Sequence, residues 1–156
     1  MIGFLEGMAQ KPEAKYKAKV HKHLPEYVYH QGMYTPFSAG TPDHWYSGIE
    51  GDLWVEYKWS NSMSQRLRLC NPEVKYPMLT HKQQSWLRNR YNEGRNVAVV
   101  FACPEGSFIF VALSWEQPLE KEVFLAKCVD VKDVAQWIEM RVSSKKHVKT
   151  KEVLPI

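Results

Sequence analysis

Hydrophobic residues recur along this chain with two periodicities, one typical of helices and one typical of strands. In residues 13–24, Tyr16, Val20 and Leu24 lie four residues apart, and polar side chains fill most positions between them. A four-residue spacing places apolar side chains on one face of a helix, so this segment is predicted to be an amphipathic helix. Pro25 cannot continue a helix and is predicted to end this one.

Extended patterns follow this first helix. Residues 26–34 are predicted to form a strand, and residues 44–46 and 53–59 the two arms of a β-hairpin whose turn spans 47–51. The second arm is rich in β-branched and aromatic residues, which favour strands. The hairpin is therefore the predicted centre of the chain.

The second arm of the hairpin carries two charges among apolar residues. Because strand side chains alternate between faces, Glu56 and Lys58 are predicted to share one face with Trp54. The opposite face is predicted to hold Leu53, Val55, Tyr57 and Trp59. Charged groups on a buried strand are costly unless they are paired or bind a metal ion. The ordinary alternative is an ion pair on a solvated face, which stabilises a protein little.

The second half of the chain begins with a polar segment and a capped helix. Residues 60–77 are mostly polar and are predicted to form a loop that contacts a substrate. Residues 79–94 are predicted to be a helix. Thr80 is a good N-cap, Gln83 completes a capping box with it, and Gly94 suits the end of the helix.

Further strands and one more helix are predicted after that. Residues 96–103 form an almost continuous apolar run, as in a strand that is covered on both faces. Residues 107–113 are predicted to be an antiparallel neighbour of that strand, and residues 123–129 a short edge strand. A last helix, capped by Asp130 or Asp133, is predicted to complete the fold.

Length, charge and cysteine usage limit the number of domains, the class of partner and the cellular compartment that we expect. The 156 residues suit one domain, here predicted to span residues 1–142, followed by a basic tail at 143–156. The net charge of +4 is compatible with a polyanionic partner. No apolar run approaches the roughly 20 residues that span a bilayer, and the first residues lack a secretory signal. Three widely spaced cysteines predict reduced, buried thiols in a cytoplasmic protein.

Short motifs around the hairpin carry a family resemblance. Pro42-Asp43, twelve further residues and then Glu56-Tyr57-Lys58 resemble the motif of the PD-(D/E)XK nuclease superfamily. The sequence Gly40-Thr41-Pro42-Asp43, with Leu79-Thr80-x-x-Gln83 opening the helix that ends at Gly94, looks like the VRR-NUC branch of that superfamily.

A second set of residues resembles the phage endonuclease I type of Holliday-junction resolvase. This set consists of Glu13, Lys19 and Leu24, then Tyr34-Thr35, then Thr41-Pro42-Asp43. The resemblances together cover roughly residues 11–113. The chain departs from both patterns in the polar segment after Trp59 and beyond Leu113.

The resemblance implies a fold and a chemistry. The implied fold is α/β (α+β), a restriction-endonuclease-like core in which helices flank a central mixed β-sheet. The implied activity is that of a Mg²⁺-dependent DNA endonuclease, with Mn²⁺ as a substitute. Asp43, Glu56 and the main-chain carbonyl of Tyr57 are the implied metal ligands, and hard cations do prefer such oxygens. Lys58 is implied to orient or help deprotonate the attacking water, or to neutralise developing charge.

Three further residues are candidates for a role in this site, and each also has an ordinary structural explanation. Glu13 is a candidate ligand for a second metal ion, or simply an acidic residue that suits the first turn of a helix. Gln83 is a candidate for contact with a metal-bound water, with Lys58 or with a phosphate. The alternative is that it only completes the capping box. Asp52 shares a strand face with Glu56 by parity but stands beside the turn, so an exposed or capping role is expected.

Basic and aromatic residues offer candidates for DNA contacts. The candidates for phosphate contact are Arg66, Arg68, Lys75, Arg88, Lys145 and Lys146, and a solvated surface charge is the alternative for each. Trp45, Trp54 and Trp59 are candidates for base stacking, or else packed aromatic residues. The six histidines show no spacing typical of a metal site.

The sequence favours a structure-selective DNA endonuclease that cuts branched, junction or nicked DNA. A resolvase cuts two strands symmetrically, so that substrate class would imply a homodimer. The resemblance also fits a phage-encoded protein that acts in the host cytoplasm. Two other classes stay open: a non-catalytic nucleic-acid-binding module on the same fold, and a phage protein-interaction factor with exposed aromatic anchors.

Overall fold

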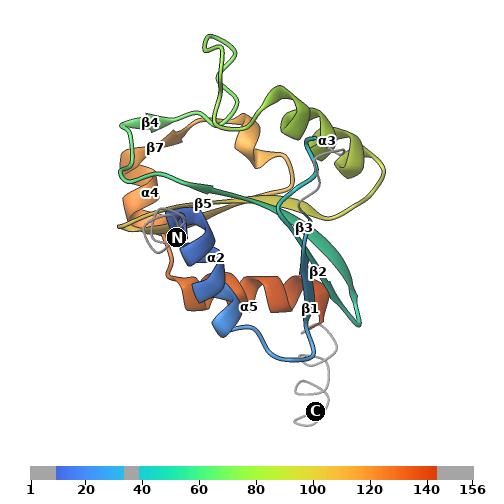
Figure 1. Cartoon of the computed structure of the whole chain (residues 1–156). Helices are drawn as coiled ribbons and strands as arrows, with labels where there is room; N and C mark the ends of the chain where they lie inside the picture. The colour runs from blue at the N-terminus through green and yellow to red at the C-terminus, as the bar shows by residue number, and fades with distance from the viewer. Residues whose placement is uncertain (1–9, 34–38, 144–156) are drawn as a thin grey trace, which may run out of the picture.

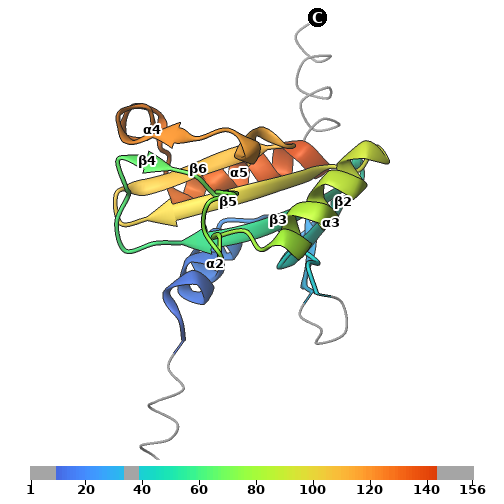
Figure 2. The same ribbon diagram turned by 90° about the horizontal axis from the view of Figure 1, so that it is seen from above.

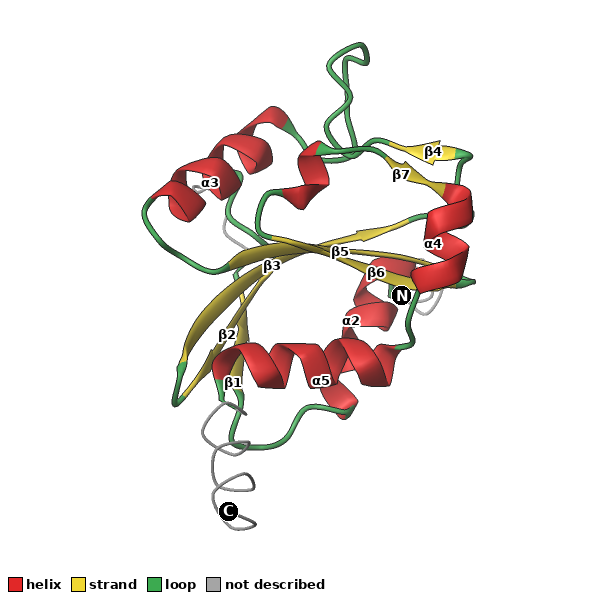
Figure 3. Ribbon diagram, turned by 180° about the vertical axis from the view of Figure 1, so that it is seen from behind, coloured by secondary structure: helices red, strands yellow, loops and turns green. Residues whose placement is uncertain are grey.

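A central β-sheet with helices on both faces organises the chain (Figures 1 and 3). The computed structural model describes residues 10–33 and 39–143. The sheet has five strands in the order β1-β2-β3-β5-β6. They are β1 (Tyr29–Gly32), β2 (His44–Gly48), β3 (Gly51–Trp59), β5 (Val97–Cys103) and β6 (Gly106–Val111). β3 and β5 run parallel and the other neighbours antiparallel, which confirms the predicted mixed sheet flanked by helices.

Each face of the sheet has its own helices and its own core. Helices α2 (Pro12–Lys22) and α5 (Val131–Val142) cover one face. Helices α3 (His81–Asn92) and α4 (Lys121–Lys127) stand at opposite ends of the other face (Figure 2). Side chains alternate along β3, so this strand contributes to both cores. Leu53, Val55 and Tyr57 pack on the α2 side, and Trp54 packs on the α3 side.

The elements with the clearest sequence patterns form as predicted. Tyr16 and Val20 are buried on the inner face of α2, and all seven residues of β5 are buried. Thr80 and Gln83 form the predicted capping box of α3. Asp130 caps α5 by accepting a hydrogen bond from the backbone N–H of Asp133 at 2.9 Å.

The prediction of an edge strand at 123–129 is wrong. Most of this segment belongs to α4, which buries only Phe124 against the ring of Phe101. Lys, Glu, Leu and Ala are good helix formers, and this local preference outweighs the weak strand signal of Val123 and Phe124. Only Val129 has strand character, in an isolated bridge to Ser107.

The polar segment after β3 is more firmly attached than its composition suggests. Two residues of it form β4 (Arg66–Leu67), which pairs with β7 (Leu119–Glu120) next to the short 3₁₀ helix η1 (Ser114–Glu116). Met63, Leu67 and Leu69 are buried in the core beneath α3 and α4. The stretch that follows stands out from the body as the green loop at the top of Figure 1.

Several predictions fall outside the described residues. These are the basic tail with Lys145 and Lys146, and the pair Tyr34-Thr35. Among the described helices, none is long and apolar enough to cross a membrane. All three cysteines are free thiols, but only Cys103 is buried, whereas Cys70 and Cys128 are half-buried. The prediction of buried thiols is therefore right for one of them.

Candidate active site

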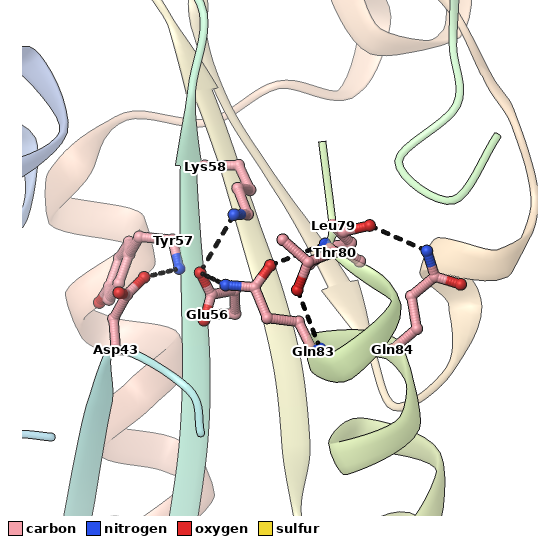
Figure 4. A network of polar contacts seen from close by, with 8 residues as sticks. All are labelled: Asp43, Glu56, Tyr57, Lys58, Leu79, Thr80, Gln83 and Gln84. Carbon is pink, nitrogen blue, oxygen red and sulfur yellow. Dashed lines mark hydrogen bonds and ion pairs between the residues drawn. The ribbon is translucent and has the colours of Figure 1, made fainter. Parts of the chain in front are cut away.

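Asp43, directly before the start of β2, lies beside β3. His44 pairs with Val55 in the antiparallel ladder, so Asp43 lies one residue before that pair, level with Glu56. The backbone N–H of Tyr57 donates a hydrogen bond to Oδ2 of Asp43 at 2.8 Å (Figure 4). The Asp43 side chain thus takes the place of a strand partner just before β2 begins, which fixes its carboxylate next to Glu56.

Glu56 occupies the centre of this site. It is 2% exposed, and its Oε2 accepts a hydrogen bond from Nε2 of Gln83 at 3.0 Å. Nζ of Lys58 lies 3.3 Å from the same oxygen (Figure 4). The second oxygen, Oε1, is buried and has no hydrogen-bond partner among the described residues. A buried carboxylate oxygen without a partner costs stability, so its retention points to a ligand.

The electrostatics of Glu56 are those of a carboxylate that lacks a cation. Burial and, after it, the charge of Asp43 raise the pKa of Glu56 to about 9, although Lys58 opposes the shift. One ammonium therefore does not compensate two adjacent carboxylates. A bound divalent cation would favour the ionised form of both.

Helix α2 brings Glu13 to the same place. Burial raises the pKa of the Glu13 carboxyl, and the charge of Asp43 adds to the shift while Lys58 and Lys17 oppose it. The charges of Asp43 and Lys58 therefore influence the Glu13 carboxyl, although no hydrogen bond or ion pair among the described residues joins Glu13 to them. The contacts bring together Asp43, Glu56 and Lys58, from the start of β2 and from β3.

Gln83 has the predicted capping-box role and one further contact that was not predicted. Its Oε1 accepts a hydrogen bond from the backbone N–H of Thr80 at 2.9 Å, as a capping-box residue does. Its Nε2 donates to Glu56, a partner that the sequence did not suggest. The start of α3 therefore holds one oxygen of Glu56, while the other oxygen stays unpaired.

The donor set fits a hard divalent cation. Asp43 and Glu56 offer carboxylate oxygens, and Glu56 Oε1 is an unpaired one. The N–H and C=O of one strand residue point to the same side, so the carbonyl of Tyr57 faces the side on which Asp43 lies. Oxygen donors of this kind suit Mg²⁺ and Mn²⁺ rather than softer metals.

Two of the basic candidates for DNA contact are already paired. Arg66 lies 3.2 Å from Glu120 across the β4–β7 pair. Nε of Arg88 lies 2.8 Å from Glu116, and its guanidinium covers the ring of Trp115. Arg68 and Lys75 are exposed, so among the described candidates they are the better placed to meet a phosphate.

The tryptophans lie in rows of packed rings. The ring of Trp54 lies 6.0 Å from that of Trp45 and 5.3 Å from that of Trp86. Trp59 packs against Tyr16 in the other core. All of these tryptophans are half-buried, so each combines a packed ring with an accessible edge.

A cluster of histidines was missed by the sequence analysis. His21, His30 and His44 each offer a ring nitrogen, and these nitrogens all lie within 4.8 Å of one another. Spacing along the chain does not show this, because the residues come from α2, β1 and β2. The structure pairs β1 with β2, which sets His30 and His44 on neighbouring strands, and that pairing was not predicted.

Comparisons with known proteins give structural similarity but no sequence match. No protein-family model matches the chain, and no curated protein sequence matches it either. The structure of Hjc, a Holliday junction resolvase from the archaeal hyperthermophile Archaeoglobus fulgidus, is similar to it with a TM-score of 0.49 and 13% sequence identity. The similarity covers 78% of this chain and 97% of that resolvase.

Proposed function

We propose that this protein is a Mg²⁺-dependent endodeoxyribonuclease that hydrolyses phosphodiester bonds in structured DNA. The observation that carries the proposal is the buried Glu56 carboxylate, which has one unpaired oxygen and lies beside Asp43 and Lys58. Two carboxylates and one ammonium at a strand end suit a divalent cation and a phosphate better than they suit stability alone.

Each residue of the site has a role in this proposal. Asp43, Glu56 and the carbonyl of Tyr57 hold the ion, and Mn²⁺ can replace Mg²⁺. When bound, such an ion polarises a phosphate and lowers the pKa of water. Lys58 orients the attacking water or neutralises the charge that develops on the phosphate. Gln83 fixes the Glu56 carboxylate, and Glu13 supports a second ion or adjusts the charge of the site.

A cleft at the far end of α3 from Gln83, lined by none of the candidate metal ligands, supports a nucleic-acid substrate. It measures about 630 Å³ and lies between the start of β3 and the end of α3. Trp54 and Trp86 line it together with Arg90 and Arg95. Aromatic rings beside guanidinium groups suit unpaired bases and their phosphates. Branched, junction or nicked DNA offers such bases close to duplex, so we propose a structure-selective activity.

Two rival functions fit the buried carboxylates less well. A module that only bound nucleic acid would gain nothing from a negative pocket that faces phosphate. A phage protein-interaction factor with exposed aromatic anchors would not need a buried carboxylate beside a lysine. Both rivals lack a role for the unpaired oxygen of Glu56.

The test is cleavage of a panel of labelled DNAs in Mg²⁺, in Mn²⁺ and in EDTA. The panel holds a four-way junction, a flap, a nicked duplex, a single strand and a plain duplex. We expect cutting that needs the metal ion, favours a branched or nicked substrate and disappears in Glu56→Gln. A junction preference would also require a dimer in native mass measurements. No cutting of any substrate, with salt-sensitive DNA binding retained, would support the binding module instead.

A further inference from the structure

Three imidazoles meet on the sheet face that α2 covers. His21 lies on α2, His30 on β1 and His44 on β2. His44 directly follows Asp43 in the chain, but none of the three histidines is one of the candidate active-site residues. A metal site here would therefore use a different set of donor atoms and would not depend on the proposed nuclease function.

The three rings are in direct contact. Nδ1 of His30 lies 2.9 Å from Nε2 of His44, and Nε2 of His21 lies 2.8 Å from the hydroxyl of Tyr46. The ring centroid of His21 is 4.2 Å from that of His30 and 4.3 Å from that of His44. His44 is 8% exposed, and its Nδ1 has no hydrogen-bond partner among the described residues.

The positions of the ring nitrogens suit a single ion. A neutral imidazole nitrogen binds a metal ion through its lone pair. The ligand nitrogens of the three residues all lie within 4.8 Å of one another, so one ion could reach a nitrogen of each ring. Nδ1 of His44 has no hydrogen-bond partner among the described residues, so it is free to accept one.

We propose that His21, His30 and His44 bind one divalent transition-metal ion, Zn²⁺ by preference. Imidazole nitrogens suit Zn²⁺, Cu²⁺ and Ni²⁺, whereas Mg²⁺ prefers oxygen. Three protein ligands leave the fourth tetrahedral position to a water molecule. The two metal sites of this chain would then differ in chemistry, with oxygen donors at one and nitrogen donors at the other.

Metal binding requires a small rearrangement of the rings. Zn–N bonds of about 2.1 Å place tetrahedral ligand nitrogens about 3.4 Å apart, so the His30–His44 hydrogen bond opens. The His21 ring turns out of its stacked position, because the lone pair of a ligand nitrogen lies in the ring plane. His30 is exposed and free to adjust, and His21 lies at the end of α2, close to its last turn.

The site would fasten an edge of the sheet. β1 is an edge strand whose four residues are all exposed, so little apolar burial holds it in place. A metal ion ligated from α2, β1 and β2 joins that edge to the helix. His44 directly follows Asp43, so the same ion would stabilise the strand end that carries a candidate catalytic carboxylate. The inferred role is structural.

The test is metal binding by the full-length chain without a histidine tag. Co²⁺ is added first, because a tetrahedral Co²⁺ site absorbs visible light, and Zn²⁺ is then added to displace it. The variants are His30→Gln, which changes an exposed ligand, and His21→Gln, which repeats the test from the helix. His23→Gln is the matched control, since His23 is exposed at the end of the same helix. Glu56→Gln removes the oxygen site.

We expect one tetrahedral Co²⁺ site per chain, with its affinity retained in His23→Gln and Glu56→Gln. His30→Gln and His21→Gln should weaken Zn²⁺ binding at least as much as the roughly 100-fold that loss of an outer-shell partner can cause. Zn²⁺ should raise the Tm of the wild type and of His23→Gln but not of His30→Gln. Equal affinity in His30→Gln, or no saturable Co²⁺ signal in the wild type, would overturn the proposal. Binding lost only in Glu56→Gln would assign the ion to the carboxylates.

Discussion

At the scale of single residues, Glu56 determines what the site can do. It is buried on a strand face between Trp54 and Lys58, and one of its oxygens is unpaired. The parity of β3 predicted that Glu56 and Lys58 share a face, because alternation depends only on the backbone. The unpaired oxygen could not be predicted, because it depends on how Gln83 of a different element meets Glu56.

The raised pKa of Glu56 predicts a pH dependence of stability in EDTA. The folded state keeps the Glu56 proton up to about pH 9, whereas the carboxyl ordinarily loses it near 4.5. The folded state therefore binds more protons, and the free energy of unfolding falls as pH rises, by at most about 1.4 kcal/mol per pH unit. Glu56→Gln should show a smaller fall.

Urea unfolding of the wild type and Glu56→Gln at pH 7, 8 and 9 measures this difference. His21 and His44 do not obscure it, because their lowered pKa values leave both rings neutral in this range. Parallel pH profiles for the two proteins would show that Glu56 is ionised in the folded state without a metal ion. Saturating Mg²⁺ should flatten the profile of the wild type.

At the scale of elements, the start of α3 both caps its own helix and contacts the candidate active site. Thr80 and Gln83 exchange hydrogen bonds, and Gln83 also reaches Glu56. The capping box was predictable from the two residue types alone.

The helical segment α4 was mispredicted because a short apolar run does not distinguish a strand from a helix. The histidine cluster was missed because it depends on strand register.

Two substitutions should separate the cap from the contact with Glu56. Thr80→Ala and Gln83→Ala both weaken the capping box, so each should lower the free energy of unfolding by about 1 kcal/mol. Only Gln83→Ala removes the hydrogen bond to Glu56, so only this variant should lower kcat/KM, by about 10-fold or more. Equal kcat/KM in the two variants would mean that Gln83 acts through the helix alone.

The hairpin turn should tolerate no side chain where it meets α5. A Cβ on Gly48 would lie 2.6 Å from the carbonyl oxygen of Val142, whereas a Cβ on Gly32 would meet only the His44 ring at 3.8 Å. Gly48→Ala should therefore destabilise the protein by about 1–3 kcal/mol, and Gly32→Ala by less than about 0.5 kcal/mol. Urea midpoints check this pair, and equal midpoints would place α5 further from the turn.

At the scale of the whole molecule, two sets of candidate metal ligands meet near the start of β2. Asp43, directly before β2, lies level with Glu56, and His44, the first residue of β2, belongs to the histidine cluster. Helix α2 serves both, since it contributes Glu13 to one site and His21 to the other. The order of the main elements could be predicted because each has a strong local period. The meeting of distant residues could not, because it depends on packing between elements.

The central claim is that Lys58, Glu56 and Asp43 perform chemistry and do not only bind DNA. The most direct test is the single-turnover cleavage rate of the wild type, Lys58→Ala and Asp52→Asn, with DNA affinity measured in parallel. Asp52 is the matched control, because it lies on the same strand but is exposed and bonded to Ser47.

The account predicts that Lys58→Ala lowers the cleavage rate by about 100-fold or more, as loss of a proton-transfer or charge-stabilising group does. Asp52→Asn should cleave at the rate of the wild type, and all three proteins should bind DNA with similar affinity. A Lys58→Ala variant that cleaves as fast as the wild type, or whose loss of activity only follows its loss of DNA affinity, would contradict the claim.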